Sequence, residues 1–256
     1  MFGRRTSRGA VEGSSTMSDT PAAGRGPHFV QSVARAFAVL RAFDAAHPSL
    51  APREVARKTG LDGATARRML STLADLGYVR GDGGAYRLTP RTLELGCAYL
   101  STLALPHLAQ PHLQSLAHAL GATASLAVLD GDDVFQLAVL PGFRRDATTV
   151  GTRFNAWESA SGFVLLAGVP DDEFERRLRA HPDQTDLRDD LKHVRARGWA
   201  LLGGAVAAPV RNRQGKVVAA IEVFVRPDLT PGIAVHEDVP ELVRTAHAIE
   251  TDLARH

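Results

Sequence analysis

LDGATARRMLSTLADL, residues 61–76, is the stretch that decides the fold of the first half of the chain. Its apolar side chains recur at the three- and four-residue spacing of one helix face: Ala66, Met69, Leu70, Leu73 and Leu76. Polar and basic side chains lie off that stripe near the start of the helix: Thr65, Arg67, Arg68 and Ser71. The pattern predicts a helix with one side in a core and the other in solvent.

A shorter amphipathic segment, residues 52–58, precedes this helix and is separated from it by Thr59, Gly60 and Leu61. Two helices joined by a tight glycine turn are typical of a helix-turn-helix, whose second helix presents its N-terminal side chains to the DNA major groove. A basic helix side is also common on proteins that never touch DNA. Arg67 and Arg68 alone therefore leave an ordinary solvated face as an equal alternative.

The residues around this pair of helices favour DNA binding. Residues 77–80 and 85–88 are short apolar strands, and GDGG at 81–84 can supply the positive backbone angles of a hairpin turn. Residues 31–43 predict a preceding helix, with Val33, Phe37, Leu40 and Phe43 on one face. Three helices followed by a hairpin indicate a winged helix.

Composition is consistent with two modest globular domains in 256 residues. No run of about 18 apolar residues is present and the N-terminus has no apolar signal core, so we expect a cytoplasmic protein without membrane contact. One cysteine excludes an intrachain disulfide and a thiolate metal cluster.

Residues 1–102 hold 14 Lys and Arg against 8 Asp and Glu, whereas the rest holds 16 against 20. A basic front half suits phosphate contacts.

Four segments are expected. Residues 1–27 form a disordered tail, because they offer almost no large apolar side chains to bury. Residues 28–88 form the winged helix-turn-helix domain, and 89–104 a linker helix that begins at Thr89 and Pro90 and packs Cys97 on its apolar side. Residues 105–256 alternate amphipathic helices with apolar strands and predict helices packed on an antiparallel sheet of about five strands. The predicted fold class is α+β.

Catalytic and metal-binding alternatives find little support in the second half. His107, His112 and His118 are spaced five and six residues apart, which does not place them on one helix face. An acidic turn, residues 130–133, lacks the glycine and glutamate positions of a calcium loop. Ser161 lacks the preceding glycine of a hydrolase elbow. We expect no catalytic residues, no metal and no cofactor, although an enzyme is kept as the remote alternative.

Short motifs in both halves together resemble the IclR family of bacterial transcription regulators over residues 29–256: SVARAFAVL (32–40), EVARKTGL (54–61), ATARRML (64–70), LGYV (76–79), YRLTPR (86–91), LELG (93–96), SLAVLD (125–130), VGTR (150–153), RGWAL (197–201) and APV (208–210). Within the family, the sequence at 44–48 and 93–100 resembles that of the branch that controls protocatechuate, hydroxybenzoate and β-ketoadipate catabolism. The resemblance implies a homodimer or tetramer, a palindromic operator in double-stranded DNA, and a GAF-like C-terminal domain that holds a small organic acid.

The resemblance also implies two sets of site residues. The DNA-contacting set is Arg53, Thr65, Arg67, Arg68, Ser71, Arg80 and Arg87. The effector-binding set is Ala156, Ser159, Ala160, Ser161, Ala205, Glu222 and Phe224. Backbone amides at a helix start can bind a carboxylate, which is why a site beginning near Ser159 suits an organic acid.

This chain departs from the family pattern in the effector-binding half. Gly203 and Gly204 stand where relatives carry about ten residues, some of them acidic, and Phe163 replaces a usual Arg or Lys. Glu222 stands where relatives usually show Asn or Ser; pointing inward, it would oppose an anionic ligand and favour its own protonated form, and the alternative is that it faces solvent. An effector-independent regulator, whose C-terminal domain only joins subunits, is therefore the second hypothesis.

Overall fold

The computed structural model of the 256-residue chain describes residues 28–142, 148–224 and 231–256. The predicted tail at 1–27 lies outside these residues. The chain forms two compact units that divide between Thr92 and Leu93, so the first linker residues group with one unit and the following helix with the other. In the described ranges, no helix combines the length and the apolar character needed to cross a membrane.

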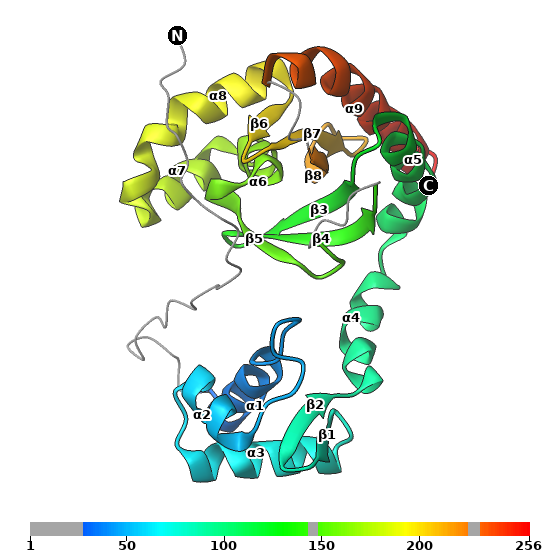
Figure 1. Cartoon of the computed structure of the whole chain (residues 1–256). Coiled ribbons are helices and arrows are strands. Elements are labelled where there is room, and N and C mark those ends of the chain that lie inside the picture. The colour runs from blue at the N-terminus through cyan, green and yellow to red at the C-terminus, as the bar shows by residue number, and fades with distance from the viewer. Residues whose placement is uncertain (1–27, 143–147, 225–230) are drawn as a thin grey trace. The chain divides into compact units, whose positions relative to one another are not determined.

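The first unit is a winged helix (Figure 1). Its elements are α1 (Gln31–Arg41), α2 (Pro52–Thr59), α3 (Gly63–Asp75) and the hairpin of β1 (Val79–Asp82) and β2 (Ala85–Leu88). Gly60 ends α2 with a positive φ of 67°, and the Asp62 side chain accepts a hydrogen bond from the Thr65 amide and caps α3. These two residues fix the turn between the helices: the glycine turn was predicted from the sequence, whereas the Asp62 cap was not.

A small core holds the three helices and the hairpin together. Its fully or nearly fully buried members are Val39, Leu50, Val55, Ala66, Leu70, Leu73 and Val79. Burying one such leucine contributes about 2 kcal/mol. The backbone of Leu50 also pairs with Tyr86, which ties the loop before α2 to the wing.

One predicted core position of this unit was wrong, and one apolar side of α1 is exposed. Val33 is 52% exposed and Phe37 is 47% exposed, whereas Val39 of α1 and Ala42 and Phe43, which follow the helix, are buried in the core. Leu76, which follows the last residue of α3, is also 52% exposed. The hairpin turn is tighter than predicted: Asp82 pairs with Ala85, and Gly83 and Gly84 alone form the turn, both with positive φ.

The second unit is built on a six-stranded antiparallel sheet with the order β5-β4-β3-β8-β7-β6. The strands are β3 (Ala124–Asp130), β4 (Asp133–Leu140), β5 (Arg153–Asn155), β6 (Ala200–Leu202), β7 (Ala205–Arg211) and β8 (Val217–Phe224). The prediction of about five strands missed β6, which has only three residues and pairs with β7 across the two-residue turn Gly203–Gly204.

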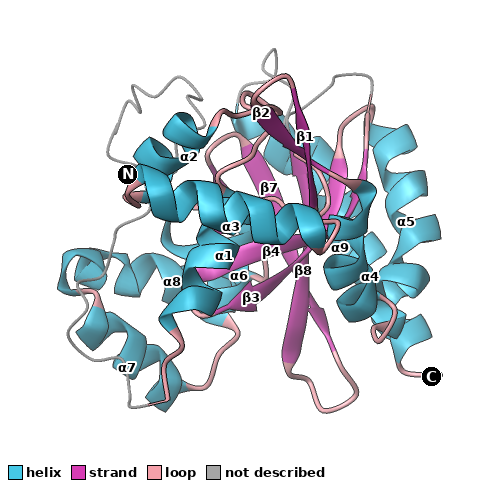
Figure 2. Ribbon diagram, turned by 90° about the horizontal axis from the view of Figure 1, so that it is seen from below, coloured by secondary structure: helices cyan, strands magenta, loops and turns pink. Residues whose placement is uncertain are grey.

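Helices cover both faces of this sheet (Figures 1 and 2). One face packs against α6 (Ala160–Ala167), α7 (Asp171–Ala180) and α8 (Arg188–Arg197). The opposite face packs against α5 (Ala104–Leu120) and α9 (Pro231–Leu253), which lie side by side. Alternate residues of β8 serve the two cores, since Ala220 faces α6 whereas Ile221 and Val223 face α5 and α9.

Shorter helical segments connect these elements. They are η1 (Pro90–Thr92), α4 (Leu93–Leu100), η2 (Ala156–Glu158) and η3 (Pro182–Leu187). Helix α4 corresponds to the predicted linker helix, but its side chains are more exposed than expected: Leu93 is 65% exposed and Cys97 is exposed. The prediction that Cys97 packs on an apolar side was therefore wrong within the single chain.

Candidate functional site

The solvent face of α3 carries the predicted arginines. Arg67, Arg68 and Ser71 are exposed, and in the view of Figure 2 the helix lies in front of the other elements of its unit along its length. Arg67 makes no hydrogen bond or ion pair to any residue that the structure describes, and Arg68 donates only a long one of 3.4 Å to Thr65 Oγ1. Two cationic side chains are thus left available on one exposed side of the helix.

Thr65, in contrast, lies on the buried side of α3. It is 6% exposed, and its amide bonds the capping carboxylate of Asp62 at 2.8 Å. The expectation that the Thr65 side chain lies off the apolar stripe was wrong, because Thr65 stands four residues before Met69 and eight before Leu73 and so shares their face of α3. The same hydrogen bond lowers the pKa of Asp62, so this carboxyl stays ionised at the positive end of the helix dipole.

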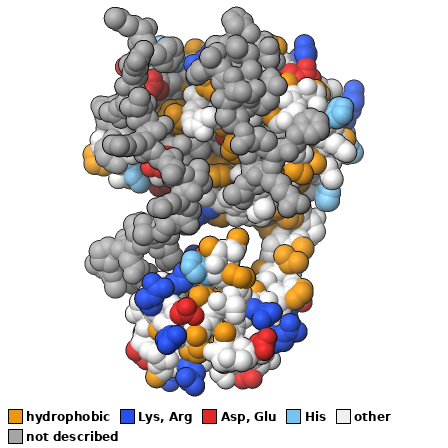
Figure 3. All heavy atoms as spheres, viewed as in Figure 1, with side chains coloured by type: hydrophobic (Ala, Val, Ile, Leu, Met, Phe, Trp, Pro, Cys, Tyr) orange, Lys and Arg blue, Asp and Glu red, His pale blue; other side chains and the backbone are white. Residues whose placement is uncertain are grey.

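Further basic residues surround α3 on the first unit, where Figure 3 shows Lys and Arg side chains gathered with a few acidic ones among them. Arg53 is exposed near the start of α2. On the wing, Arg80 and Arg87 are direct cross-strand partners, and Arg87 forms an ion pair with Asp82 at 3.1 Å. Two like charges placed directly opposite each other are destabilising, and the Asp82 carboxylate partly offsets this pair through Arg87.

Lys58 differs from these arginines because it is already paired. Its ammonium group lies 2.9 Å from Asp44, whose pKa it lowers to about 2, with His47 contributing a further hydrogen bond. The pair joins the loop after α1 to α2. Lys58 therefore serves the internal structure of the unit, whereas Arg53, Arg67 and Arg80 have no ion pair among the described residues.

The second candidate site lies at the start of α6. Ser159 caps this helix by accepting a hydrogen bond from the Gly162 amide at 3.1 Å, which confirms the predicted helix start. Ala156, Ala160 and Ser161 are buried beneath it. A Cβ on Gly162 would meet the backbone of Ala156 at 2.1 Å, so only glycine lets α6 approach η2 this closely.

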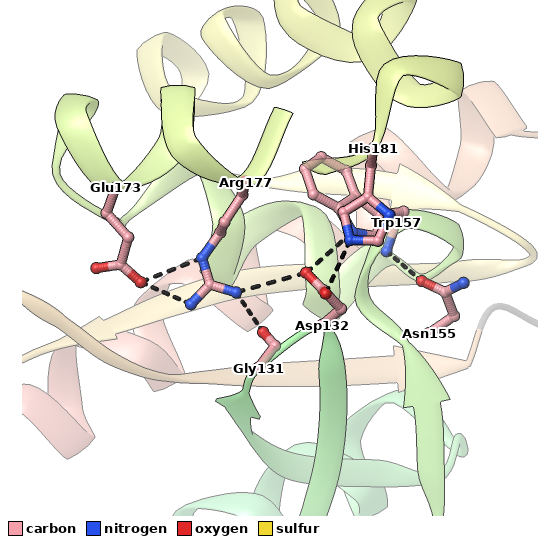
Figure 4. A network of polar contacts seen from close by, with 7 residues as sticks. All are labelled: Gly131, Asp132, Asn155, Trp157, Glu173, Arg177 and His181. Atoms are coloured by element: carbon pink, nitrogen blue, oxygen red, sulfur yellow. Dashed lines mark hydrogen bonds and ion pairs between the residues drawn. The ribbon is translucent and has the colours of Figure 1, made fainter. Parts of the chain in front are cut away.

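A polar network fixes the turn that leads into α6 (Figure 4). Asp132, in the turn between β3 and β4, accepts hydrogen bonds from Trp157 Nε1 at 3.3 Å and pairs with His181 Nε2 at 2.8 Å. Arg177 of α7 adds an ion pair to Asp132 and is itself held by Glu173. The network joins three separate parts of the chain and holds Trp157 in place, three residues before α6 begins.

Glu222 settles the question that the sequence left open, because it points inward. It is 3% exposed and lies on the face of β8 that packs against α6. One carboxylate oxygen accepts a hydrogen bond from the Ser161 amide at 3.3 Å, and the other accepts bonds from Ser161 Oγ at 3.3 Å and Gln136 Nε2 at 3.4 Å. Burial raises the pKa of Glu222 to about 7, more than these hydrogen bonds lower it.

Two neighbours of Glu222 were missed by sequence reasoning. Gln136 of β4 and Ser125 of β3, the latter directly opposite Glu222 in the sheet, are both fully buried. Ser125 Oγ and Gln136 Oε1 have no hydrogen-bond partner among the described residues. Each polar residue interrupts an otherwise apolar strand at an inward position, and that interruption was the available signal.

The remaining predicted effector residues lie near this polar cluster or border the same core. Ala205 begins β7 and is 4% exposed, and Phe224 ends β8 and is partly buried. Both pack into the core that contains α6, as does Phe163. Gly203 and Gly204 form a tight turn with φ of 61° and 77°, so no acidic loop is present between β6 and β7. The carboxylate nearest to the α6 amides is therefore Glu222 itself.

Comparison with protein families finds two adjacent matches. Residues 32–83 match the IclR helix-turn-helix domain, and residues 97–250 match the C-terminal domain of bacterial IclR transcriptional regulators. A Pca regulon regulatory protein from Pseudomonas putida is 33% identical over 217 residues, which cover 77% of this chain and 75% of the relative. The two family matches follow each other in the order of the two units described above.

Solved structures agree with this assignment. A transcriptional regulator from Rhodococcus sp. RHA1 is 38% identical, with a TM-score of 0.74 over 88% of this chain and 98% of that one. An IclR homologue from Microbacterium hydrocarbonoxydans, complexed with 4-hydroxybenzoate, is 26% identical, with a TM-score of 0.73 over 87% of this chain and 98% of that one. The chain belongs to the IclR family of bacterial regulators, which bind DNA through a helix-turn-helix and control transcription rather than catalyse a reaction.

Proposed function

We propose that this regulator recognises a palindromic operator through the exposed side of α3. Arg67, Arg68 and Ser71 would meet base edges and phosphates, and Arg53, Arg80 and Arg87 would steady the DNA backbone. The observation that carries this assignment is the unpaired state of Arg67 and Arg68, since Lys58 is already neutralised within the fold. An arginine that reads guanine contributes about 1–3 kcal/mol of discrimination. Thr65 would contribute indirectly, because its backbone amide bonds the Asp62 carboxylate that caps α3.

A homodimer is the natural form for such an operator, because a palindrome presents the same half-site twice. The exposed apolar side chains of α1 and α4 support it: Val33 and Phe37 on α1, and Leu93, Leu95 and Tyr99 on α4. Exposed large apolar side chains on a helix are typical of a surface that a partner covers, and each unit carries one such helix. A second copy of the chain is the proposed partner, and pairs of dimers would form the tetramer.

The operator would be bound in the cytoplasm.

The C-terminal domain would hold a small aromatic or dicarboxylic acid near the start of α6. The relatives named above support this class of ligand, since one carries the name of the Pca regulon and another was solved with 4-hydroxybenzoate. The physical basis is the buried amide of Ser161 in the first turn of α6, which can donate to a carboxylate. Ser159, Ala156 and Ala160 would border the ligand.

An effector-independent regulator is the second candidate, and one observation favours it. Glu222 already occupies the Ser161 donors that an acid would use, and the Gly203–Gly204 turn offers no loop to cover a ligand. In that case the C-terminal domain joins subunits and operator affinity is the same with or without a metabolite.

Two measurements test these assignments. Fluorescence anisotropy with the intergenic DNA beside the gene should show specific binding, and Arg67→Ala with Arg68→Ala should abolish it without changing the oligomer. Isothermal titration with protocatechuate, 4-hydroxybenzoate and β-ketoadipate should give a binding signal from at least one acid. Silence from all three, under acidic as well as neutral conditions, would favour the effector-independent regulator.

A further inference from the structure

The polar cluster formed by Ser125, Gln136, Ser161 and Glu222 is unusual in its balance of donors and acceptors. Ser161 supplies an amide and a hydroxyl, Gln136 supplies one amide group, and a single carboxylate takes all three hydrogen bonds. All four residues are at least 97% buried, given that Glu222 at 3% is the most exposed. A carboxylate in such a place is held by the α6 start in the manner of a bound acid.

We propose that Glu222 is a built-in competitor for the carboxylate site, so that this regulator binds an acidic effector only when Glu222 is protonated and releases Ser161. The proposal rests on the effector site assigned above. It adds that the ligand and one proton bind together. The ligand carboxylate takes the place of the Glu222 carboxylate at the Ser161 amide, and the neutral Glu222 carboxyl can then donate a hydrogen bond.

Charge makes the two carboxylates mutually exclusive. An ionised Glu222 and an ionised ligand would place two negative charges side by side in a buried site, which is strongly unfavourable. No cation compensates them, because the described groups that face Glu222 are Ser125 on β3, Gln136 on β4, Ala207 on β7 and Ser161 on α6, none of which titrates in the relevant range. Uptake of one proton by Glu222 removes the repulsion.

Two buried polar atoms of the cluster are free to bond a further donor or acceptor. Among the residues described, Ser125 Oγ and Gln136 Oε1 have no hydrogen-bond partner, although unpaired buried polar atoms are costly. Protonated Glu222 becomes a donor, and a carbonyl oxygen such as Gln136 Oε1 is a suitable acceptor for it. Gln136 Oε1 can therefore accept the hydrogen bond that Glu222 donates once it has taken up a proton.

Burial sets the pH range in which this exchange operates. The pKa of Glu222 is raised to about 7, so the competent protonated form dominates near pH 6 and becomes a minor form near pH 8. The apparent affinity for an anion falls in proportion to the fraction of protonated Glu222. From about pH 6 to about pH 8 that fraction falls by roughly tenfold, and the apparent dissociation constant should rise by roughly the same factor.

The test is isothermal titration of the full-length protein with 4-hydroxybenzoate at about pH 6, 7 and 8, a range in which its carboxyl group stays ionised. Wild type should bind roughly tenfold more weakly at the upper end, with proton uptake seen as a buffer-dependent heat. Glu222→Gln should bind with the same affinity, within about twofold, at each pH. Glu158→Gln removes an exposed carboxylate on η2 and should behave as wild type.

The outcomes separate this proposal from the proposed function. A flat pH profile in wild type, or a slope that Glu222→Gln retains, would overturn the competition while leaving the acid effector in place. Wild type, Glu222→Gln and Glu158→Gln share all their histidines, so the difference between variants isolates Glu222. Absence of binding by wild type and Glu222→Gln at every pH would overturn the acid effector as well, and with it the competition.

Discussion

The Glu222 carboxylate lies 3.3 Å from the backbone nitrogen of Ser161, although 61 residues separate them in the chain. The contact joins the middle of the sheet to the first turn of α6. It places a side chain of the protein on the very amide that an acidic ligand would need. The two proposed sites therefore differ, because Arg67 has no ion pair among the described residues whereas the Ser161 amide already donates to a carboxylate.

Stability should depend on pH through Glu222. Its pKa is about 7 in the folded protein and near 4.5 in the unfolded chain, so the folded state binds more protons between these values. The free energy of unfolding therefore falls as pH rises from about 4.5 through 7, by up to about 3 kcal/mol from this group. Urea unfolding of wild type and Glu222→Gln across this range should show a difference that grows with pH. A constant difference would contradict the burial argument.

Replacing Arg67 and Arg68 by alanine should remove specific DNA binding. Each arginine contributes about 1–3 kcal/mol if it reads a base, so the double variant should lose about 2–6 kcal/mol and bind the operator at least about thirtyfold more weakly. Because both side chains are exposed, melting temperature and oligomeric state should not change. Lys192→Ala is the matched control, since Lys192 is an exposed cation on α8 of the other unit. Equal binding by the double variant and Lys192→Ala would contradict the assignment of α3.

The wing arginines should act on salt dependence rather than on sequence preference. Arg80→Ala removes one of two opposed cations, so the slope of log affinity against log salt should become shallower by about one, on operator and unrelated DNA alike. Arg87→Ala should have a smaller effect, because Arg87 already pairs with Asp82. Anisotropy titrations at several salt concentrations measure both slopes. A loss confined to the operator would indicate that the wing reads bases instead.

The exposed apolar side chains of α1 should matter for assembly and not for folding. Phe37 is 47% exposed and Val33 is 52% exposed, so changing both to serine removes little from the core of the single chain. We expect the double variant to unfold at the same denaturant concentration when dilute, to shift toward the monomer in sedimentation velocity, and to bind a full palindrome more weakly than wild type. Val39→Ala, at a fully buried position of the same helix, should show the opposite pattern.

Much of the fold followed from periodic apolar patterns and turn residues. The order of α2, α3 and the wing was predictable because Gly60, Asp62 and the Gly83–Gly84 turn each leave a local signal. Errors came where local pattern and tertiary packing compete. Thr65 is polar, yet its helical spacing from Met69 and Leu73 places it on the buried face of α3, and Val33 and Phe37 lie on a side of α1 that the single chain leaves exposed.

The effector-binding half was less predictable for a different reason. The start of α6 at Ser159 has a capping signature, but the inward direction of Glu222 depends on the register between β8 and its neighbours. A shift of one residue would turn it to the other face. Ser125 and Gln136 were missed although each interrupts an apolar strand, because only the cross-strand register shows that they lie beside Glu222.

The Gly203–Gly204 turn closes a ladder in which Leu202 already pairs with Ala205. The two-residue turn fixes the register of β6 against β7, but each doubling of a loop costs only about 0.6 kcal/mol in closure entropy. The hairpin is thus a site at which a longer segment could be grafted beyond the Leu202–Ala205 pair at little entropic cost. A designer could alter the chemical preference of the domain there, leaving the interior as it is.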